Sequence, residues 1–334
     1  MKLSVIIPTL NRYKTLNHLI EQLDNLGNRI EEIIIIDSTD EENRKIIYPA
    51  SKLRYFTTNH KNGLFQRYAG YVVAKSEWLL FLDNDMELIG DAFLSEFEQL
   101  ASRENISGIA FRIQDKHPNT SLASIPKHLI FTKKSSFKSF LSWFTGYSKL
   151  PPGKLGFCGN RGKQPQDRQN TEWLSGGAFA AKKEYLFYNF NFQLFNLFEK
   201  KLGMGEDVLF GYGLSKKGDL VYSDKLLFYH NDQKDSAYST DHFAYSRRVI
   251  FSRLHLSMEK ARLDGTNLIW PKLFYHWFVF WRLVGLFFNF IIDPSVTRKK
   301  LLLGGLKGWG LIFTFKYPDP ILNKEYWQKE AKLI

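Results

Sequence analysis

The chain has 334 residues, 44% of them hydrophobic, which is enough to bury the core of one large α/β domain or of one domain with an appendage. Its formal charge of +12 indicates an anionic partner or surface, and nucleic acid, phosphorylated substrates and acidic lipid headgroups all meet that condition. The single cysteine, Cys158, excludes an internal disulfide and fits a reducing cytosol.

The first eighty residues alternate between apolar runs and amphipathic segments. The run Leu3–Pro8 is short and ends at proline, so we expect a buried strand there rather than a signal peptide. Residues 12–27 carry leucines and isoleucine at helical spacing, with Gly27 as the stop signal. Further elements are predicted as strands at 31–37, 53–58 and 78–82 and as a helix at 63–76. This alternation predicts a parallel sheet with helices on both faces.

Polar side chains follow the predicted strands at the point where each strand ends. Thr9 follows the first strand, Asp37 the second, and Asp83 and Asp85 the fourth. Ligands bind at the carboxyl ends of the strands in such sheets. We therefore expect one crevice to collect these four side chains.

Asp83 and Asp85 are separated by one residue, and residues two apart in an extended segment point the same way. Two unpaired carboxylates repel each other, whereas a divalent cation removes the repulsion. Hard oxygen ligands with open positions suit Mg²⁺ or Mn²⁺ bound jointly to a diphosphate. The same pattern is also compatible with a solvated acidic turn or a helix N-cap.

Six segments then occur in a recognisable order and spacing: SVIIPTLNR, IIIIDSTD, NHKNGLFQRYAG, FLDNDMEL, TEWLSGGAFAAKKE and GMGEDVLFGYGLSKKG. Over residues 3–232 they resemble the non-processive, inverting type of family 2 glycosyltransferases. The resemblance implies a GT-A fold, which is an α/β architecture with a Rossmann-like, mostly parallel sheet and helices on both faces. The Q-x-x-R-W motif of the family's polymerising members is not found in the chain.

The resemblance also implies roles on the donor side of the site. Pro8 and Thr9 match the backbone that meets the nucleobase, and Asp37 matches the acid that contacts the base or ribose. Asp83 matches a residue near the ribose, and Arg67 an arginine that reaches toward the nucleotide. As structural alternatives, Asp37 caps a turn and Arg67 is a solvated helix residue.

Gln66 and Tyr68 stand where the family pattern often has alanine and asparagine, so the chain departs from the pattern on both sides of Arg67.

On the metal and acceptor side, Asp85 matches the direct metal ligand, and His230 resembles a later histidine that completes the metal or diphosphate site. Asp207, in the E-D motif, matches the catalytic base that takes a proton from the acceptor hydroxyl. A structural histidine and a helix cap are the alternatives for His230 and Asp207. Three residues are expected to bind the acceptor: Trp173, Gly176 and Glu206.

We expect a catalytic domain at 1–235, followed by a helical region at 236–334. The first contains a nucleotide-sugar-binding half (1–113), a basic acceptor loop (114–171) and an acceptor and catalytic half (172–235). The loop is rich in glycine, proline and lysine and has no period. It is either a solvated loop or a basic lid for a phosphorylated or lipid-diphosphate-linked acceptor.

The C-terminal region carries an aromatic, apolar run at 273–292 that Arg282 interrupts, and a mixed basic and apolar run at 298–317. A central arginine makes a poor membrane span. We therefore expect interfacial helices on an anionic membrane surface, at the cytoplasmic face. Packing on the catalytic core or in a homodimer, and a true span, are the alternatives.

Together these patterns predict a metal-dependent, inverting glycosyltransferase that uses Mg²⁺ or Mn²⁺. It would move a sugar from a nucleotide-sugar donor to a hydroxyl of a lipid-linked or cell-envelope glycan. Another transferase that handles nucleotide sugars is the first alternative. A basic nucleic-acid-binding protein is the second, although acid-lined strand ends repel a phosphate backbone, so we expect no nucleic acid partner.

Overall fold

The computed structural model describes residues 1–45, 47–115, 150–186, 190–231 and 241–334. The predicted basic loop at 114–171 therefore lies partly outside the described residues, and its described part begins again at residue 150.

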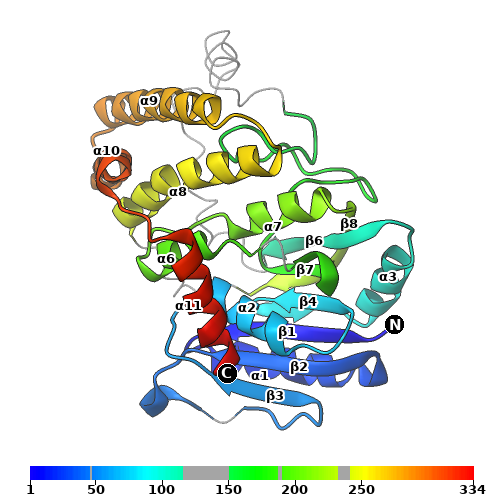
Figure 1. Cartoon of the computed structure of the whole chain (residues 1–334). Coiled ribbons are helices and arrows are strands. Elements are labelled where there is room, and N and C mark those ends of the chain that lie inside the picture. The colour runs from blue at the N-terminus through cyan, green and yellow to red at the C-terminus, as the bar shows by residue number, and fades with distance from the viewer. Residues whose placement is uncertain (46, 116–149, 187–189, 232–240) are drawn as a thin grey trace.

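The strands of the structure form one eight-stranded sheet in the order β3-β2-β1-β4-β7-β6-β8-β5 (Figure 1). Their bounds are β1 Leu3–Thr9, β2 Ile30–Asp37, β3 Leu53–Thr57, β4 Trp78–Leu82, β5 Met86–Leu88, β6 Ile106–Asp115, β7 Ala178–Lys182 and β8 Asp219–His230. Four of the seven strand pairings are parallel, so the sheet is mixed. The parallel arrangement predicted for the first four strands is confirmed.

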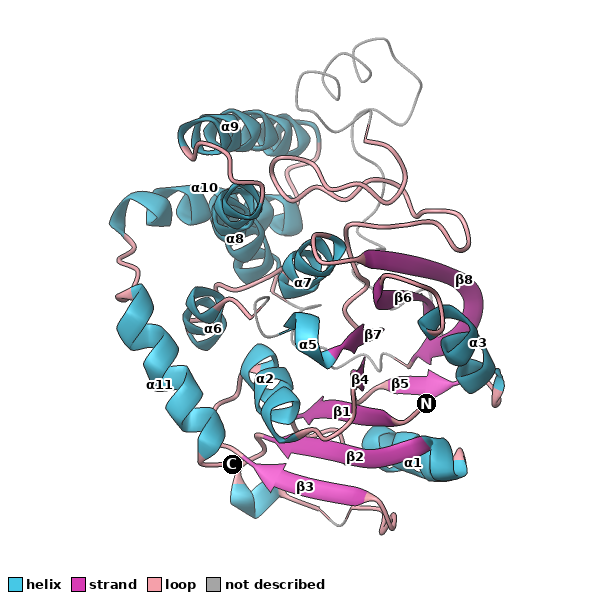
Figure 2. Ribbon diagram, turned by 45° about the vertical axis from the view of Figure 1, so that its right-hand side comes forward, coloured by secondary structure: helices cyan, strands magenta, loops and turns pink. Residues whose placement is uncertain are grey.

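Helices cover both faces of this sheet (Figure 2). Their bounds are α1 Tyr13–Asp24, α2 Gly63–Val73, α3 Ala92–Ala101, α5 Lys183–Leu186, α6 Phe192–Glu199, α7 Glu206–Ser215, α8 His242–Leu263, α9 Ile269–Ile292, α10 Val296–Thr314 and α11 Pro320–Lys332. The two helices predicted in the first eighty residues are confirmed as α1 and α2.

The isoleucine run of β2 shows why this segment is a buried strand. Ile33 and Ile35 belong to the apolar cluster that includes the leucines of α1. Ile34 and Ile36 point the other way, into the cluster that includes Phe65 of α2. All four isoleucines are fully buried, because a strand covered on both faces has no polar side.

The C-terminal helices share a core with the first part of the chain. Phe251 of α8 and Trp327 of α11 belong to the same apolar cluster as Ile34. Helix α10 approaches α8 closely at Gly304, where a Cβ would overlap a backbone carbonyl of α8. By contrast, α9 lies at the outer edge of the molecule in Figure 1.

Candidate active site

The ends of β1 and β2 form the donor-side edge of the candidate site. Thr9 and Asp37 are partners in the register of these parallel strands, and Pro8 precedes Thr9 opposite Ile36. The structure therefore places the three predicted nucleoside-contacting residues side by side. Their predicted contact with a nucleotide stays a prediction.

The Asp37 carboxylate is fully buried and has an internal network of its own. Its Oδ2 accepts hydrogen bonds from the hydroxyls of Tyr13 at 2.6 Å and Tyr55 at 2.7 Å. Its Oδ1 accepts one from the backbone N–H of Thr39 at 2.7 Å, which is a turn contact. Burial, together with the hydrogen bond to Asp37, raises the pKa of both tyrosines. The hydrogen bonds of Asp37 thus stabilise the edge of the site.

Two residues that sequence reasoning did not select hold this edge together. Gln66 donates from Nε2 to the carbonyls of Thr9 at 2.8 Å and Ile36 at 2.6 Å. Asn84, between the two aspartates, donates to Oγ1 of Thr9 at 2.7 Å. The departure of Gln66 from the family pattern was the signal that it has a role of its own.

Asp83 and Asp85 have different partners, although they leave the same strand. The chain turns after β4, and the Met86 N–H donates to the carbonyl of Asp83 at 3.1 Å. Asp83 Oδ1 then accepts from Arg67 Nη2 at 2.6 Å, whereas Asp85 pairs with Arg12 and His230. The turn thus directs the two carboxylates into separate ion pairs, and their joint approach to one cation stays a prediction.

The pKa values of the two aspartates are shifted in opposite directions. Burial raises the pKa of Asp83, and repulsion from Asp85 adds to the effect. Burial acts on Asp85 in the same sense, but the hydrogen bond and charge of His230, with Arg12, outweigh it and lower its pKa. His230 and Arg12 therefore stabilise the ionised form of Asp85.

The pairing of β5 with β8 brings His230 to Asp85, because Met86 and His230 are register partners. His230 Nε2 lies 3.4 Å from Asp85 Oδ2, and its Nδ1 lies 3.2 Å from Asp115 Oδ1. Asp115, at the end of β6, was not predicted, and no sequence signal pointed to it.

The donor set at Asp85 fits a divalent cation that is shared with a diphosphate. Asp85 Oδ1 is buried and has no hydrogen-bond partner among the described residues. An orphaned carboxylate oxygen beside an imidazole suits Mg²⁺ or Mn²⁺. In the described part of the chain, no group of three or more His, Cys, Asp or Glu side chains could hold a metal. A cation here would need oxygens from water and the donor.

Arg67 joins the donor side to the acceptor side. Its buried guanidinium donates to Asp83 at 2.6 Å, to Glu206 at 3.1 Å and to the carbonyl of Gly176 at 3.1 Å. Burial opposes the charge, but the two carboxylates outweigh it and raise the pKa of Arg67. Arg67 is thus a buried cross-link and not the solvated helix residue of the alternative.

Asp207 lies directly beside the segment predicted to bind the acceptor. Gly205, at φ +85°, turns the chain so that α7 begins at Glu206. A Cβ on Gly176 would lie 3.4 Å from Asp207 Oδ2. A Cβ on Gly211 would meet the backbone of Trp173 at 2.6 Å, so α7 packs directly on that segment. The structure therefore places Gly176 and Glu206 beside Asp207, and Trp173 against the same helix.

Charges around α7 complete this side of the site. Burial raises the pKa of Glu206, and repulsion from Asp207 adds to it. Arg161, from the described part of the basic loop, has Nη1 3.7 Å from Asp207 Oδ2. Its guanidinium lies over the ring of Trp173, 5.3 Å from the centroid. Arg161 lies within the predicted basic loop, but no motif in the sequence singles it out.

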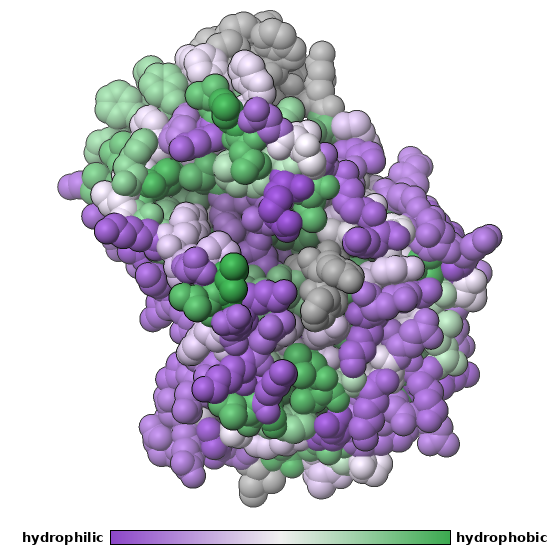
Figure 3. Space-filling view, in the orientation of Figure 1, coloured by the Kyte–Doolittle hydropathy of each residue, from purple (hydrophilic) through white to green (hydrophobic). Residues whose placement is uncertain are grey.

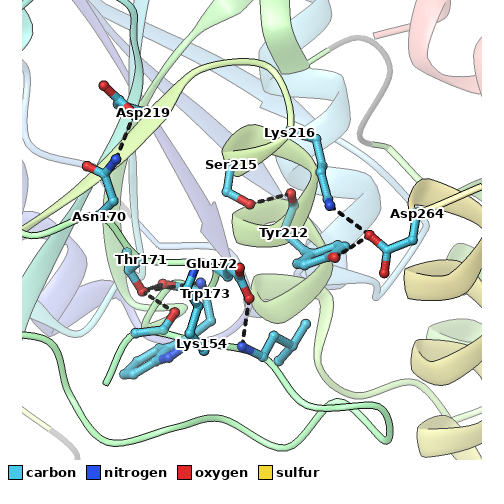
Figure 4. Close-up of polar contacts among 12 residues, drawn as sticks. Lys154, Asn170, Thr171, Glu172, Trp173, Tyr212, Ser215, Lys216, Asp219 and Asp264 are labelled. Atoms are coloured by element: carbon cyan, nitrogen blue, oxygen red, sulfur yellow. Dashed lines mark hydrogen bonds and ion pairs between the residues drawn. The ribbon is translucent and has the colours of Figure 1, made fainter. Parts of the chain in front are cut away.

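A second polar network fixes the far end of α7 (Figure 4). The Asp264 carboxylate accepts from Lys216 at 2.7 Å and Lys260 at 2.8 Å, and also from the hydroxyl of Tyr212. Burial alone would raise the pKa of Asp264, but these hydrogen bonds lower it to about 2. Helix α7 is therefore held at both ends, on α2 and on α8.

A mixed sheet covered by helices, with acids at the ends of its parallel strands, agrees with the GT-A fold that the resemblance implies. The family model described as glycosyl transferase family 2 matches residues 4–185. The chain belongs to glycosyl transferase family 2, and this decides between the enzymatic and non-enzymatic classes.

Two curated glycosyltransferases are similar to part of the chain. One is GalNAc(5)-diNAcBac-PP-undecaprenol beta-1,3-glucosyltransferase of Campylobacter jejuni, 31% identical over 42% of this chain and 47% of its own length. The other is 4,4'-diaponeurosporenoate glycosyltransferase of Staphylococcus haemolyticus, 31% identical over 34% of this chain and 32% of its own length. The chain thus matches less than half of either relative.

Solved structures resemble the chain more remotely. S. aureus TarS 1-349 in complex with UDP-GlcNAc is 17% identical, with a TM-score of 0.48 over 92% of this chain and 80% of its own. A mannosyltransferase from Pyrobaculum calidifontis, in complex with GDP-Man and Mn2+, is 10% identical, with a TM-score of 0.46 over 98% and 84%.

Proposed function

We propose that this glycosyltransferase is inverting and metal-dependent, and that it transfers a sugar from a nucleotide diphosphate to a hydroxyl of a lipid-linked or cell-envelope glycan. The observation that carries the proposal is the bridge made by Arg67. It ties Asp83 at the donor edge to Glu206 at the start of α7, and so holds Asp207 beside that edge.

Each residue has one task in this proposal. Asp207 takes the proton of the acceptor hydroxyl as it attacks the anomeric carbon, and a single direct displacement inverts that carbon. Arg67 holds Asp83 and Glu206 in place, and the ring of Trp173 lies beneath the guanidinium of Arg161 on the same side of the site. When bound at Asp85 and His230, a cation would supply positive charge for the departing nucleoside diphosphate.

A membrane-bound acceptor is supported by the surface of α9. Hydrophobic side chains gather over α9 and α10 in the upper part of Figure 3. The exposed large apolar residues of α9 are Ile269, Trp270, Leu273, Phe274, Trp277, Phe280, Phe287, Phe288, Ile291 and Ile292. Exposed lysines lie on the same two helices at positions 272, 299, 300 and 307. Aromatic residues beside lysines are typical of helices that lie on anionic membranes.

Among the described helices, α9 alone is long and apolar enough to cross a membrane, and 28% of its apolar window is buried inside the protein. We favour a peripheral position on the cytoplasmic face, because α9 packs along one side on α8 through Tyr275 and Val279. The name of the Campylobacter relative specifies an acceptor on PP-undecaprenol, which is a lipid of the proposed kind.

The test is a panel of UDP-, GDP- and dTDP-sugars, scored by thermal shift of the full-length protein with and without Mn²⁺. We expect one donor to raise the melting temperature, and Mn²⁺ to enlarge that shift. With the donor so identified, NMR of the transferred sugar should show an inverted anomeric centre. Retention of configuration, or donor binding that is equal in EDTA, would contradict the proposal.

A further inference from the structure

A hairpin in the described part of the basic loop connects the surface of α9 with Asp207. Gly156 N–H donates to the carbonyl of Asn160 at 2.8 Å, and Gly162 N–H donates to the carbonyl of Lys154 at 2.8 Å. Gly159, at φ +66°, makes the reversal. We call residues 153–162 the acceptor hairpin.

The tip of the acceptor hairpin is held on α9. Phe157 stacks on Phe274 with ring centroids 5.3 Å apart, and it is still 62% exposed. Cys158 is buried beneath α9, where its Sγ donates to the carbonyl of Phe274 at 3.9 Å. Arg253 of α8 donates to the carbonyl of Cys158 at 2.8 Å. The tip thus adds an aromatic ring to the exposed apolar surface.

The base of the acceptor hairpin is held on α7. Leu155 is buried against Val208 and Tyr212, and it forms a bridge with Arg161 across the hairpin. Arg161 therefore projects from a braced backbone toward Asp207.

The guanidinium of Arg161 has N–H groups that remain available to a ligand. It is about half exposed, and its nearest carboxylate among the described residues is the Asp207 oxygen at 3.7 Å, beyond hydrogen-bond distance. Arg67, which is also close to the E-D motif, is already engaged by three acceptors. The indole Nε1–H of Trp173, beneath Arg161, is buried and finds no acceptor among the described residues. Planar, unused donors of this kind suit a phosphate or diphosphate.

We propose that the acceptor hairpin binds an amphiphilic diphosphate, with Arg161 on the phosphate and the rings of Phe157 and Phe274 along the apolar chain. Arg161 is four positions after Phe157 in the chain, a span of at most about 14 Å. This inference rests on the proposed function, and it assigns the acceptor's anionic group to a side chain that the family motifs do not include.

The test is a titration of full-length protein with farnesyl diphosphate and with inorganic pyrophosphate in EDTA, followed by calorimetry. EDTA keeps divalent cations from the donor side, so that the diphosphate reports on the acceptor hairpin. Arg161→Gln should weaken binding of both probes by about tenfold or more. Phe157→Ser should weaken farnesyl diphosphate but not pyrophosphate, since only the first has an apolar chain.

Arg29→Gln is the matched control, because Arg29 also lies 3.7 Å from a carboxylate oxygen, that of Glu98 on α3, and is similarly exposed. It should bind both probes like the wild type. Equal affinities in the Arg161 and Arg29 variants, or a wild type that binds neither probe, would overturn the inference. The titration requires no sugar transfer. If the protein transfers sugar but fails this test, the proposed function still holds and only the role of the acceptor hairpin is rejected.

Discussion

The sheet and helix α9 are both rich in large apolar residues, but they place them very differently. The four consecutive isoleucines of β2, at positions 33–36, are fully buried, because helices cover both faces of the strand. Helix α9 buries Tyr275 and Val279 against α8 and leaves Trp270 62% exposed. The sheet's apolar residues therefore stabilise the fold and position its polar edge, whereas those of α9 are available to a membrane or partner.

The largest effect is expected at the polar edge of the sheet. Asp85→Ala removes the carboxylate that faces His230 and should abolish metal-dependent donor binding and transfer, while the fold survives. Donor binding by thermal shift with and without Mn²⁺, and transfer with labelled donor, measure this. Wild-type turnover in the variant, or full activity in EDTA, would show that the edge has only a structural role.

Asp207→Asn should have the next largest effect, because an amide keeps the shape of the carboxylate but accepts no proton. We expect transfer to fall by roughly 10²–10⁴, the usual contribution of a general base, with donor binding near the wild-type value. Steady-state kinetics and donor titration separate the two quantities. A variant with weakened donor binding and an unchanged maximal rate would remove Asp207 from catalysis.

Two tryptophans sharpen the comparison between buried and exposed apolar residues. Trp327 of α11 is 1% exposed and packs tilted on Phe65 and edge-on to Phe195, so Trp327→Ala should cost about 3–5 kcal/mol of unfolding free energy. Trp270→Ala, the matched exposed change, should leave stability almost unaltered. Urea denaturation measures both. Equal losses would mean that α9 is part of the core.

The double change Trp270→Ser and Phe274→Ser should lower membrane binding several-fold without unfolding the protein, because both rings are exposed. Flotation with phosphatidylglycerol vesicles, against neutral vesicles, measures the binding. High salt should release only part of the wild-type protein, since apolar burial is insensitive to salt. A compact dimer that ignores vesicles would assign this surface to a homodimer, and extraction only by detergent would indicate a span.

The smallest effect is expected at Asp264, which ties α7 to α8. Asp264→Asn should reduce stability by about 1–2 kcal/mol at neutral pH, because charged hydrogen bonds are lost. The pKa of this carboxyl is lowered to about 2 from its usual 3.8, so its contribution is complete above about pH 4 and is lost as pH falls toward 2. The variant should therefore lose less stability than the wild type over that acid range. Parallel acid titrations by circular dichroism would show no difference if Asp264 is unimportant.

The donor half was the most predictable part of the chain. Apolar runs that end in Thr9, Asp37 and Asp83 are local patterns, and a two-sided sheet is the arrangement that buries such runs. The position of Arg67 was also predicted, but its cross-link was not, because Glu206 lies far away in the sequence. A contact between residues so far apart in the sequence depends on how their segments pack together in the folded chain.

The sequence by itself determined the strands and helices of the first half, the family, and the residue types at the site, because these are encoded by local spacing and by motifs. The tertiary structure decided which partners those residues have. The turn after β4 sends Asp83 to Arg67 and Asp85 to His230, and a hairpin in an aperiodic loop brings Arg161 to Asp207. Both depend on backbone hydrogen bonds and close packing between distant segments, which leave no periodic signal in the sequence.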